Sequence, residues 1–195
     1  VSSGLVKGLI SLDGLNTPME EAVSEMLTAL RDAESAAVAE ELSFLPKAIY
    51  VCNTNILADD ASQTDDPKQP FDQRQAPPIL IWRYLTEQCG VPADEIAVYA
   101  DLKTHKDFSL PVDFVLFNGG DSDYDDFVAG DFRHIIFNRT LQEGWDDPSV
   151  YFAYVDKTME SSVQITQVVG RVLRQPGATH YQADRLNTAH FYVRV

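Results

Sequence analysis

Long apolar runs are missing from this sequence, and its first residues do not form the charged and apolar pattern of a secretory signal. A transmembrane helix needs roughly 18 or more consecutive apolar residues, and no stretch here approaches that length. We therefore expect a cytoplasmic protein with no membrane partner. The chain opens on Val1 instead of Met and closes on an apolar run, which indicates a piece of a longer polypeptide.

Cysteine and histidine are scarce, with two and four residues. Their spacing matches no metal-binding or catalytic pattern, so we predict no metal site. Both cysteines lie among apolar residues and are expected to be buried free thiols. The histidines are expected to be ordinary surface or core residues. These residues are Cys52, Cys89, His105, His134, His180 and His190.

Basic residues are few, because 15 Lys and Arg face 30 Asp and Glu and give a formal net charge of −15. This balance counts against a simple nucleic-acid-binding surface, which normally carries a basic patch. The acidic residues cluster in 59–66 and 121–126, however. A locally neutral or basic groove can therefore exist near Arg139, Arg171 and Arg174.

What the sequence does have is 195 residues with 45% hydrophobic content, enough for a substantial core. Unalternated apolar runs interleave with helical patterns, which is typical of a parallel sheet covered on both faces. We predict a loop at 59–78 and a short strand pair or ordered arm at 1–15. The predicted strands are 48–54, 95–100, 112–117, 133–138, 150–155 and 189–195, and the predicted helices are 18–45, 79–89, 124–128 and 161–174.

The last of these helices carries the most specific pattern. Apolar residues of 161–174 fall on one side of a helix, while Gln167, Gly170, Arg171 and Arg174 share the other side. A glycine inside a helix costs roughly 1 kcal/mol against alanine, which suggests that another group approaches closely at Gly170. Two arginines and a glutamine on a helix are also typical of a solvated face.

A second pattern follows the strand predicted at 133–138, where Glu-Gly-Trp-Asp occupies 143–146. Ligands of parallel sheets bind beyond the carboxyl ends of the strands, so this connection is a candidate site. A tight turn between strands, with Trp145 as an apolar plug, is the alternative.

Together these patterns resemble the C-terminal, RecA-like motor domain of superfamily 2 helicases, most closely the Res subunit of type III restriction enzymes. The pattern at 143–146 is similar to the fifth helicase motif, and Gln167-x-x-Gly170-Arg171-x-x-Arg174 is similar to the last. Residues 48–54 resemble the fourth motif, and 174–176 with 186–191 resemble the segment that follows the last one. The resemblance covers 46–195. The arm and long helix at 1–45 match no motif and are expected to belong to the same domain.

The resemblance implies a role for individual residues. Arginine suits the charge that develops on a transferring phosphoryl group, because its guanidinium stays charged and donates two parallel hydrogen bonds. The residues with catalytic roles are Arg171, Arg174 and Gln167. Those near the nucleotide are Gly144, Asp146 and Gly170, and those near nucleic acid are Asn53, Thr54, Asn138, Arg139 and Thr140. Asn138 stands where many relatives carry Thr, which departs from the family pattern.

The sequence contains no G-x-x-x-x-G-K-[ST] phosphate loop and no acidic D-E-x-H box. In the family these belong to an N-terminal RecA-like domain, which holds most of ATP and Mg²⁺. The implied partners are that domain, duplex DNA, and a methyltransferase or specificity subunit, although the residues do not distinguish DNA from RNA. This chain alone should therefore be inactive as an ATPase. The alternative is a degenerate RecA-like domain that serves as a non-catalytic interaction or structural module.

Overall fold

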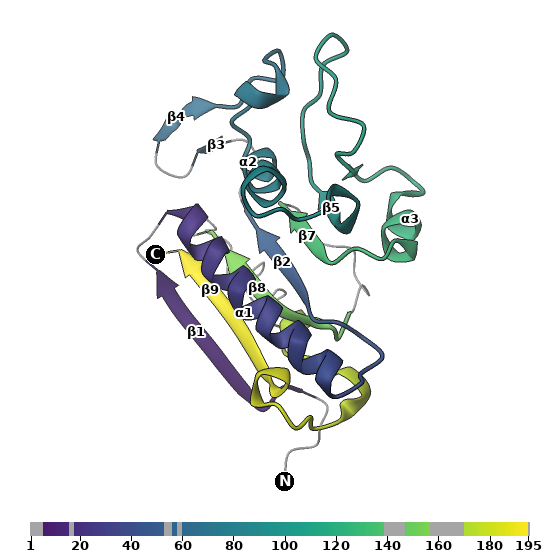
Figure 1. Cartoon of the computed structure of the whole chain (residues 1–195). Coiled ribbons are helices and arrows are strands. Elements are labelled where there is room, and N and C mark those ends of the chain that lie inside the picture. The colour runs from purple at the N-terminus through teal and green to yellow at the C-terminus, as the bar shows by residue number, and fades with distance from the viewer. Residues whose placement is uncertain are drawn as a thin grey trace. The chain divides into compact units, whose positions relative to one another are not determined.

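The computed structural model describes residues 6–15, 18–52, 56–57, 60–138, 147–156 and 170–194. Within these ranges seven strands form one parallel sheet in the order β1-β9-β8-β2-β7-β5-β6, and β3 and β4 form a separate antiparallel pair (Figure 1). This arrangement confirms the predicted α/β class with a parallel, RecA-like sheet and packed helices.

The strands are β1 (Leu9–Leu15), β2 (Lys47–Val51), β3 (Ile56–Leu57), β4 (Asp60–Thr64), β5 (Ile96–Tyr99), β6 (Leu116–Phe117), β7 (His134–Phe137), β8 (Val150–Val155) and β9 (Thr188–Arg194). The α-helices are α1 (Met19–Ala39), α2 (Pro77–Arg83) and α3 (Asp123–Ala129). A π-helical turn, Tyr84–Gln88, continues α2. Short 3₁₀ turns occupy Phe71–Gln73, Ala93–Glu95, Pro176–Ala178 and Asp184–Asn187.

The chain divides into two compact units. Unit 1 combines Val1–Ile49 with Asp146–Val195, and unit 2 is Tyr50–Trp145. Because the division falls inside β2, that strand contributes residues to both units. The prediction that 1–45 and 46–195 form one domain stays a prediction.

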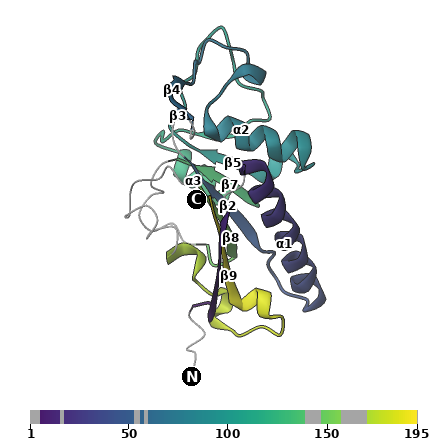
Figure 2. The ribbon, with the colours of Figure 1, turned by 90° about the vertical axis from the view of Figure 1, so that its left-hand side faces the viewer.

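Unit 1 is built on β1, β9 and β8, which pair in parallel. Every residue of β8 is buried, as expected for a strand with covered faces. Helix α1 packs against β8 and β9 through an alanine- and leucine-rich stripe. Figure 2 shows α1 on one face of these strands and the yellow-green segment 170–178 on the other. Within the described residues 6–15, the N-terminal arm contributes one strand, β1, which pairs in parallel with β9, and Val6 forms a separate antiparallel bridge with Arg174.

Unit 2 contains β7, β5 and β6, with β5 paired in parallel to both neighbours. Helix α2 packs on β7 and α3 packs on β6. Phe127 anchors α3 through ring contacts with Tyr99 and Phe117. Gly90, with φ of +69°, follows the π-helical turn and ends the α2 segment.

Several predicted bounds shift by a few residues, and three predicted elements differ more strongly from the structure. Helix α1 ends at Ala39 and not near residue 45, because Glu41 adopts a φ of +55°, which is outside the helical region. The strand predicted at 112–117 is only Leu116–Phe117, and Val112 is fully exposed. The loop predicted at 59–78 contains β4 and a 3₁₀ turn, and its Asp65 and Arg74 form a buried ion pair. We predicted a loop because this stretch is rich in polar residues, and composition alone does not reveal which of them pair with each other.

Both cysteines are free thiols; Cys52 is buried and Cys89 is half-buried. Among the helices in the described ranges, none combines the length and apolar character required to cross a membrane.

Candidate functional site

The described part of the predicted arginine helix is its C-terminal end. Residues 170–172 are helical, and Val172 is buried. The helix ends there, two residues earlier than predicted, because Arg174 forms an antiparallel bridge with Val6. Arg171 is half-buried and Arg174 is exposed. The last arginine therefore lies on the surface of unit 1, on a backbone held by the N-terminal arm.

The side chain of Lys7 binds the backbone that leads to Arg174. Its side chain is buried, at 3% exposure, and its ammonium lies 4.0 Å from the centre of the Tyr151 ring. The Lys7 ammonium donates hydrogen bonds to the carbonyl oxygens of Val172, at 2.7 Å, and of Arg174. Because carbonyls at a helix C-terminus carry partial negative charge, a buried cation is well placed there.

The same ammonium reaches the connection that leads into β8. It donates to the carbonyl oxygen of Val150 at 3.1 Å and to that of Pro148 at 3.4 Å. Pro148 lies two residues after Asp146, which the resemblance places near the nucleotide. One buried cation thus joins residues 170–174, called the arginine segment below, to the chain that follows the predicted nucleotide-binding motif.

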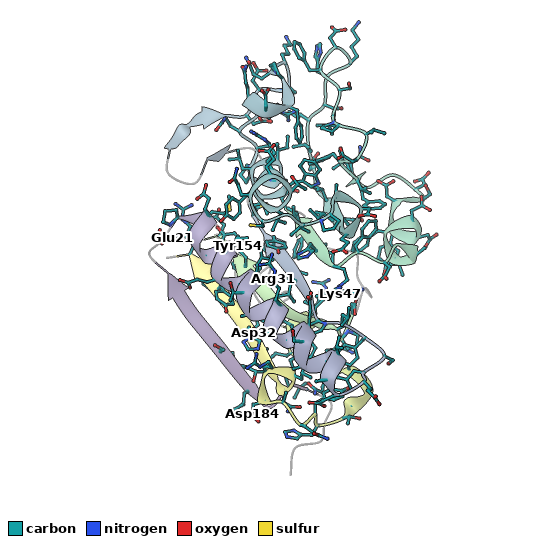
Figure 3. All side chains as sticks on the ribbon, viewed as in Figure 1. Glu21, Arg31, Asp32, Lys47, Tyr154 and Asp184 are labelled. Carbon is teal, nitrogen blue, oxygen red and sulfur yellow. The ribbon has the colours of Figure 1, made fainter. Side chains whose placement is uncertain are left out.

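Asp147 in this connection is fixed by a second lysine. Lys47, at the start of β2 (Figure 3), forms an ion pair of 2.8 Å with the Asp147 carboxylate. The same carboxylate accepts hydrogen bonds from the backbone N–H and hydroxyl of Ser149. Burial raises the pKa of Asp147, but the bonds from Lys47 and Ser149 outweigh burial, so the pKa lies below its ordinary value.

These groups gather at the amino end of β8, whereas ligands of parallel sheets bind beyond the carboxyl ends of the strands. The ligand site predicted at 143–146 lies outside the described residues. Val150 is the first residue of β8, and it shares the Lys7 ammonium with Val172 and Arg174. The reason is topological. The chain between two parallel strands must return to the amino edge before it can begin the next strand, so the end of such a connection lies there.

Several predicted site residues lie outside the described residues, and their placement stays a prediction. They are Asn53, Thr54, Arg139, Thr140, Gly144, Asp146 and Gln167. Gly170, Arg171, Arg174 and Asn138 are described.

Gly170 is exposed and open. No described heavy atom of other parts of the chain lies within 4 Å of a Cβ built on it. The close approach that the sequence suggested is therefore not made by those atoms.

Asn138 belongs to unit 2 and follows β7. Its side-chain oxygen accepts a hydrogen bond of 2.9 Å from the backbone N–H of Asp101, after β5. Asn138 is 8% exposed, and its buried Nδ2 has no hydrogen-bond partner among the described residues. The residue ties the carboxyl ends of β5 and β7 together. The predicted contact of Asn138 with nucleic acid stays a prediction. Its side-chain oxygen already accepts a hydrogen bond, so such a contact would involve the Nδ2 group.

Gln175 and Asn187, which lie in the segments that resemble the family's tail, hydrogen-bond to each other. The Gln175 amide donates to the side-chain oxygen of Asn187 at 3.2 Å and to the carbonyl oxygens of Leu186 and Thr179. The Asn187 amide donates to the carbonyl oxygen of Tyr181 at 2.8 Å. These hydrogen bonds hold together the chain between the arginine segment and β9.

Sequence reasoning missed Lys7, Lys47 and Asp147. A lone lysine in the apolar run 1–15 was the available signal for Lys7, because a cation among apolar residues must find buried acceptors. No such signal marks the pairing of Lys47 with Asp147, which are 100 residues apart.

The chain matches no protein-family model and no curated protein. Nor does the described part contain a group of three or more His, Cys, Asp or Glu side chains arranged to hold a metal ion.

Proposed function

We propose that this chain is the C-terminal motor half of an ATP-dependent superfamily 2 helicase or translocase of the type III restriction Res kind, working in the cytoplasm. The observation that carries the proposal is the exposed arginine segment, residues 170–174, although it ends at the amino end of β8 and parallel sheets bind ligands at their carboxyl ends. Arg174 is exposed there, Gly170 is open, and the backbone between them is held by Lys7. The parallel sheet supports the same assignment.

In this proposal ATP, with its Mg²⁺, is held mainly by an N-terminal RecA-like domain. Arg171 and Arg174 donate hydrogen bonds to phosphate oxygens and stabilise charge on the transferring phosphoryl group. Gln167 orients the γ-phosphate or the attacking water, and Gly144 and Asp146 complete the wall near the ribose. Closure of the two domains brings these groups to ATP, and reopening changes the grip on DNA.

DNA binding is proposed for Asn53, Thr54, Asn138, Arg139 and Thr140, with a methyltransferase or specificity subunit as a further partner. The net charge of −15 requires that the DNA path avoids the acidic surface. The alternative is a degenerate RecA-like domain with a structural role. It is favoured by the same charge and by the burial of Asn138.

The test is DNA-stimulated ATPase activity of the full encoded polypeptide that contains this chain. Arg174→Ala should lower kcat by about 100-fold or more, because an arginine that stabilises the transition state contributes at least that much. Arg174→Lys should recover only part of the loss, because lysine lacks the planar fork. Arg185→Ala is the matched control, because Arg185 is another exposed arginine of unit 1. Its ion pair with Asp32 is exposed and long, at 3.7 Å.

Gly170→Ala separates function from folding. It should leave stability unchanged or raise it by about 0.5–1 kcal/mol, because alanine favours the helix and the Cβ meets open space. ATPase activity should nevertheless fall if ATP or the partner domain approaches Gly170. A polypeptide without a phosphate loop, or an ATPase that Arg174→Ala leaves unchanged, would favour the structural module.

A further inference from the structure

Lys7 is a buried cation that the proposed catalysis does not use directly. Its ammonium donates to four backbone carbonyl oxygens, those of Pro148, Val150, Val172 and Arg174. An ammonium group has three protons, so these four acceptors share them. The face of Tyr151 covers the same cation. Burial raises the pKa of Tyr151, whose hydroxyl donates to the carbonyl oxygen of Leu186, so the ring stays neutral.

The acceptors belong to two segments that are far apart in the sequence. Val172 and Arg174 belong to the arginine segment, while Pro148 and Val150 belong to the connection into β8. The main chain adds a further link, because the Lys7 N–H donates to the carbonyl oxygen of Leu173 at 2.6 Å. Three consecutive carbonyls of the arginine segment are therefore held by one residue of the N-terminal arm.

Stability alone is a weak reason for such an arrangement. Removing a charge from water is costly, and well-packed apolar residues often replace buried charged groups without loss of stability. Position is a stronger reason. The carbonyls of residues 172–174 are fixed, whereas the Arg174 side chain remains exposed. The lysine thus defines where the base of that side chain lies, relative to the chain next to Asp146.

We propose that Lys7 is a positioning residue that fixes the backbone beneath Arg174 and ties it to the connection before β8. The anchoring concerns this chain alone. Its consequence for catalysis rests on the proposed function. Misplacement of a reacting group by about 1 Å can cost on the order of 100-fold in rate, so a loosened Arg174 should be a poor catalyst.

Hydrogen–deuterium exchange of this chain tests the anchoring. Lys7→Met should speed exchange in peptides that cover 170–178 and 147–150, with exchange in β5 and β7 unchanged. Lys47→Met is the matched control, because Lys47 binds Asp147 but none of the acceptors at 172–174. It should affect 147–150 and leave 170–178 protected. Uniform acceleration over the chain, or unchanged exchange at 170–178, overturns the proposal.

A double-mutant cycle on the full polypeptide tests positioning. Lys7→Met should lower kcat at least about tenfold with KM for ATP within about twofold, and should add less than about twofold in an Arg174→Ala background. Lys7→Arg keeps a cation and should retain part of kcat. If the methionine variant does not fold, Lys7→Gln, which removes the charge and keeps two donor protons, replaces it in both experiments with the same expected results. Equal losses in both backgrounds contradict the proposal.

The two proposals fail in different ways. If Arg174→Ala leaves the ATPase unchanged, the motor assignment fails, and the exchange experiment still decides whether Lys7 anchors residues 172–174. If Arg174→Ala abolishes activity while Lys7→Met leaves kcat unchanged, the motor assignment stands and the positioning role of Lys7 fails.

Discussion

Single buried charges organise this protein at the residue scale, and Arg74 is the clearest case. The Arg74 side chain is 1% exposed and the Asp65 side chain 2%. The guanidinium donates to the Asp65 carboxylate through Nε and Nη2 and also to the carbonyl oxygen of Lys103. Burial raises the pKa of Asp65, but the bonds from Arg74 and from the Gln75 N–H outweigh it, so the pKa lies below its ordinary value.

Asp65→Asn should therefore destabilise the chain by about 3 kcal/mol at pH 7, because it leaves a buried guanidinium without its counter-charge. Urea unfolding measures this loss. Asp66→Asn is the control at an exposed neighbour and should change stability by less than about 0.5 kcal/mol.

The lowered pKa of Asp65 determines how the stability of the chain changes with pH. Because the folded pKa of Asp65 is depressed, its contribution is present above the unfolded value of about 3.9 and is lost as pH falls through the folded pKa. The stability difference between the native chain and Asp65→Asn should then shrink as pH falls below about 4. Parallel curves down to pH 2 would show that the charge of Asp65 contributes nothing.

At the scale of elements, side-chain amides replace regular structure between the arginine segment and β9. Asn187 accepts from the Tyr181 N–H and the Gln175 amide, and its own amide donates to the carbonyl oxygens of Tyr181 and Ala183. Donors and acceptors alternate, so an amide fits where a carboxylate does not. The entry into β9 depends on this one side chain.

Asn187→Asp should cost about 3 kcal/mol, because a buried carboxylate would face two carbonyl oxygens without a proton to share. Thermal and urea unfolding measure the change. Gln88→Glu makes the same amide-to-acid change on an exposed residue and should lie within about 0.5 kcal/mol of the native chain. Equal effects of the two substitutions would mean that the hydrogen-bond network is dispensable.

Elements were predictable where burial alone decides them. The six residues of β8 are apolar and fully buried, and its predicted and observed bounds agree. Elements were missed where specific pairings decide them, as for β4, which pairs with β3, and for the 3₁₀ turn beside the buried pair of Asp65 and Arg74. The end of the arginine helix was misplaced because the backbone of Val6, remote in the sequence, forms a β-bridge with that of Arg174.

For the whole molecule the dominant quantity is its net charge of −15. Repulsion among the excess negative charges destabilises the folded state. Salt screens this repulsion, with a Debye length of about 8–10 Å at 0.1–0.15 M ionic strength. Net charge therefore couples the stability of this fold to ionic strength.

Raising NaCl from about 20 mM to about 300 mM should stabilise the chain by about 1 kcal/mol, or roughly 2–4 °C in Tm. Differential scanning fluorimetry at pH 8 measures the shift. The Asp121→Asn/Asp125→Asn double variant reduces the charge in the acidic cluster and should show a smaller shift. A Tm that falls with salt would contradict self-repulsion as the dominant effect.

The amino-acid sequence by itself determined the class of fold, because apolar runs that bury both faces of a strand leave a pattern that can be read locally. It also marked the arginine motif, because helical spacing is a local property. Only the tertiary structure decided that the motif ends at the amino edge of β8 over Lys7. A buried cation binds the acceptors that are near it in space. The acceptors of Lys7 lie more than 140 residues away along the chain, so the local sequence does not reveal them.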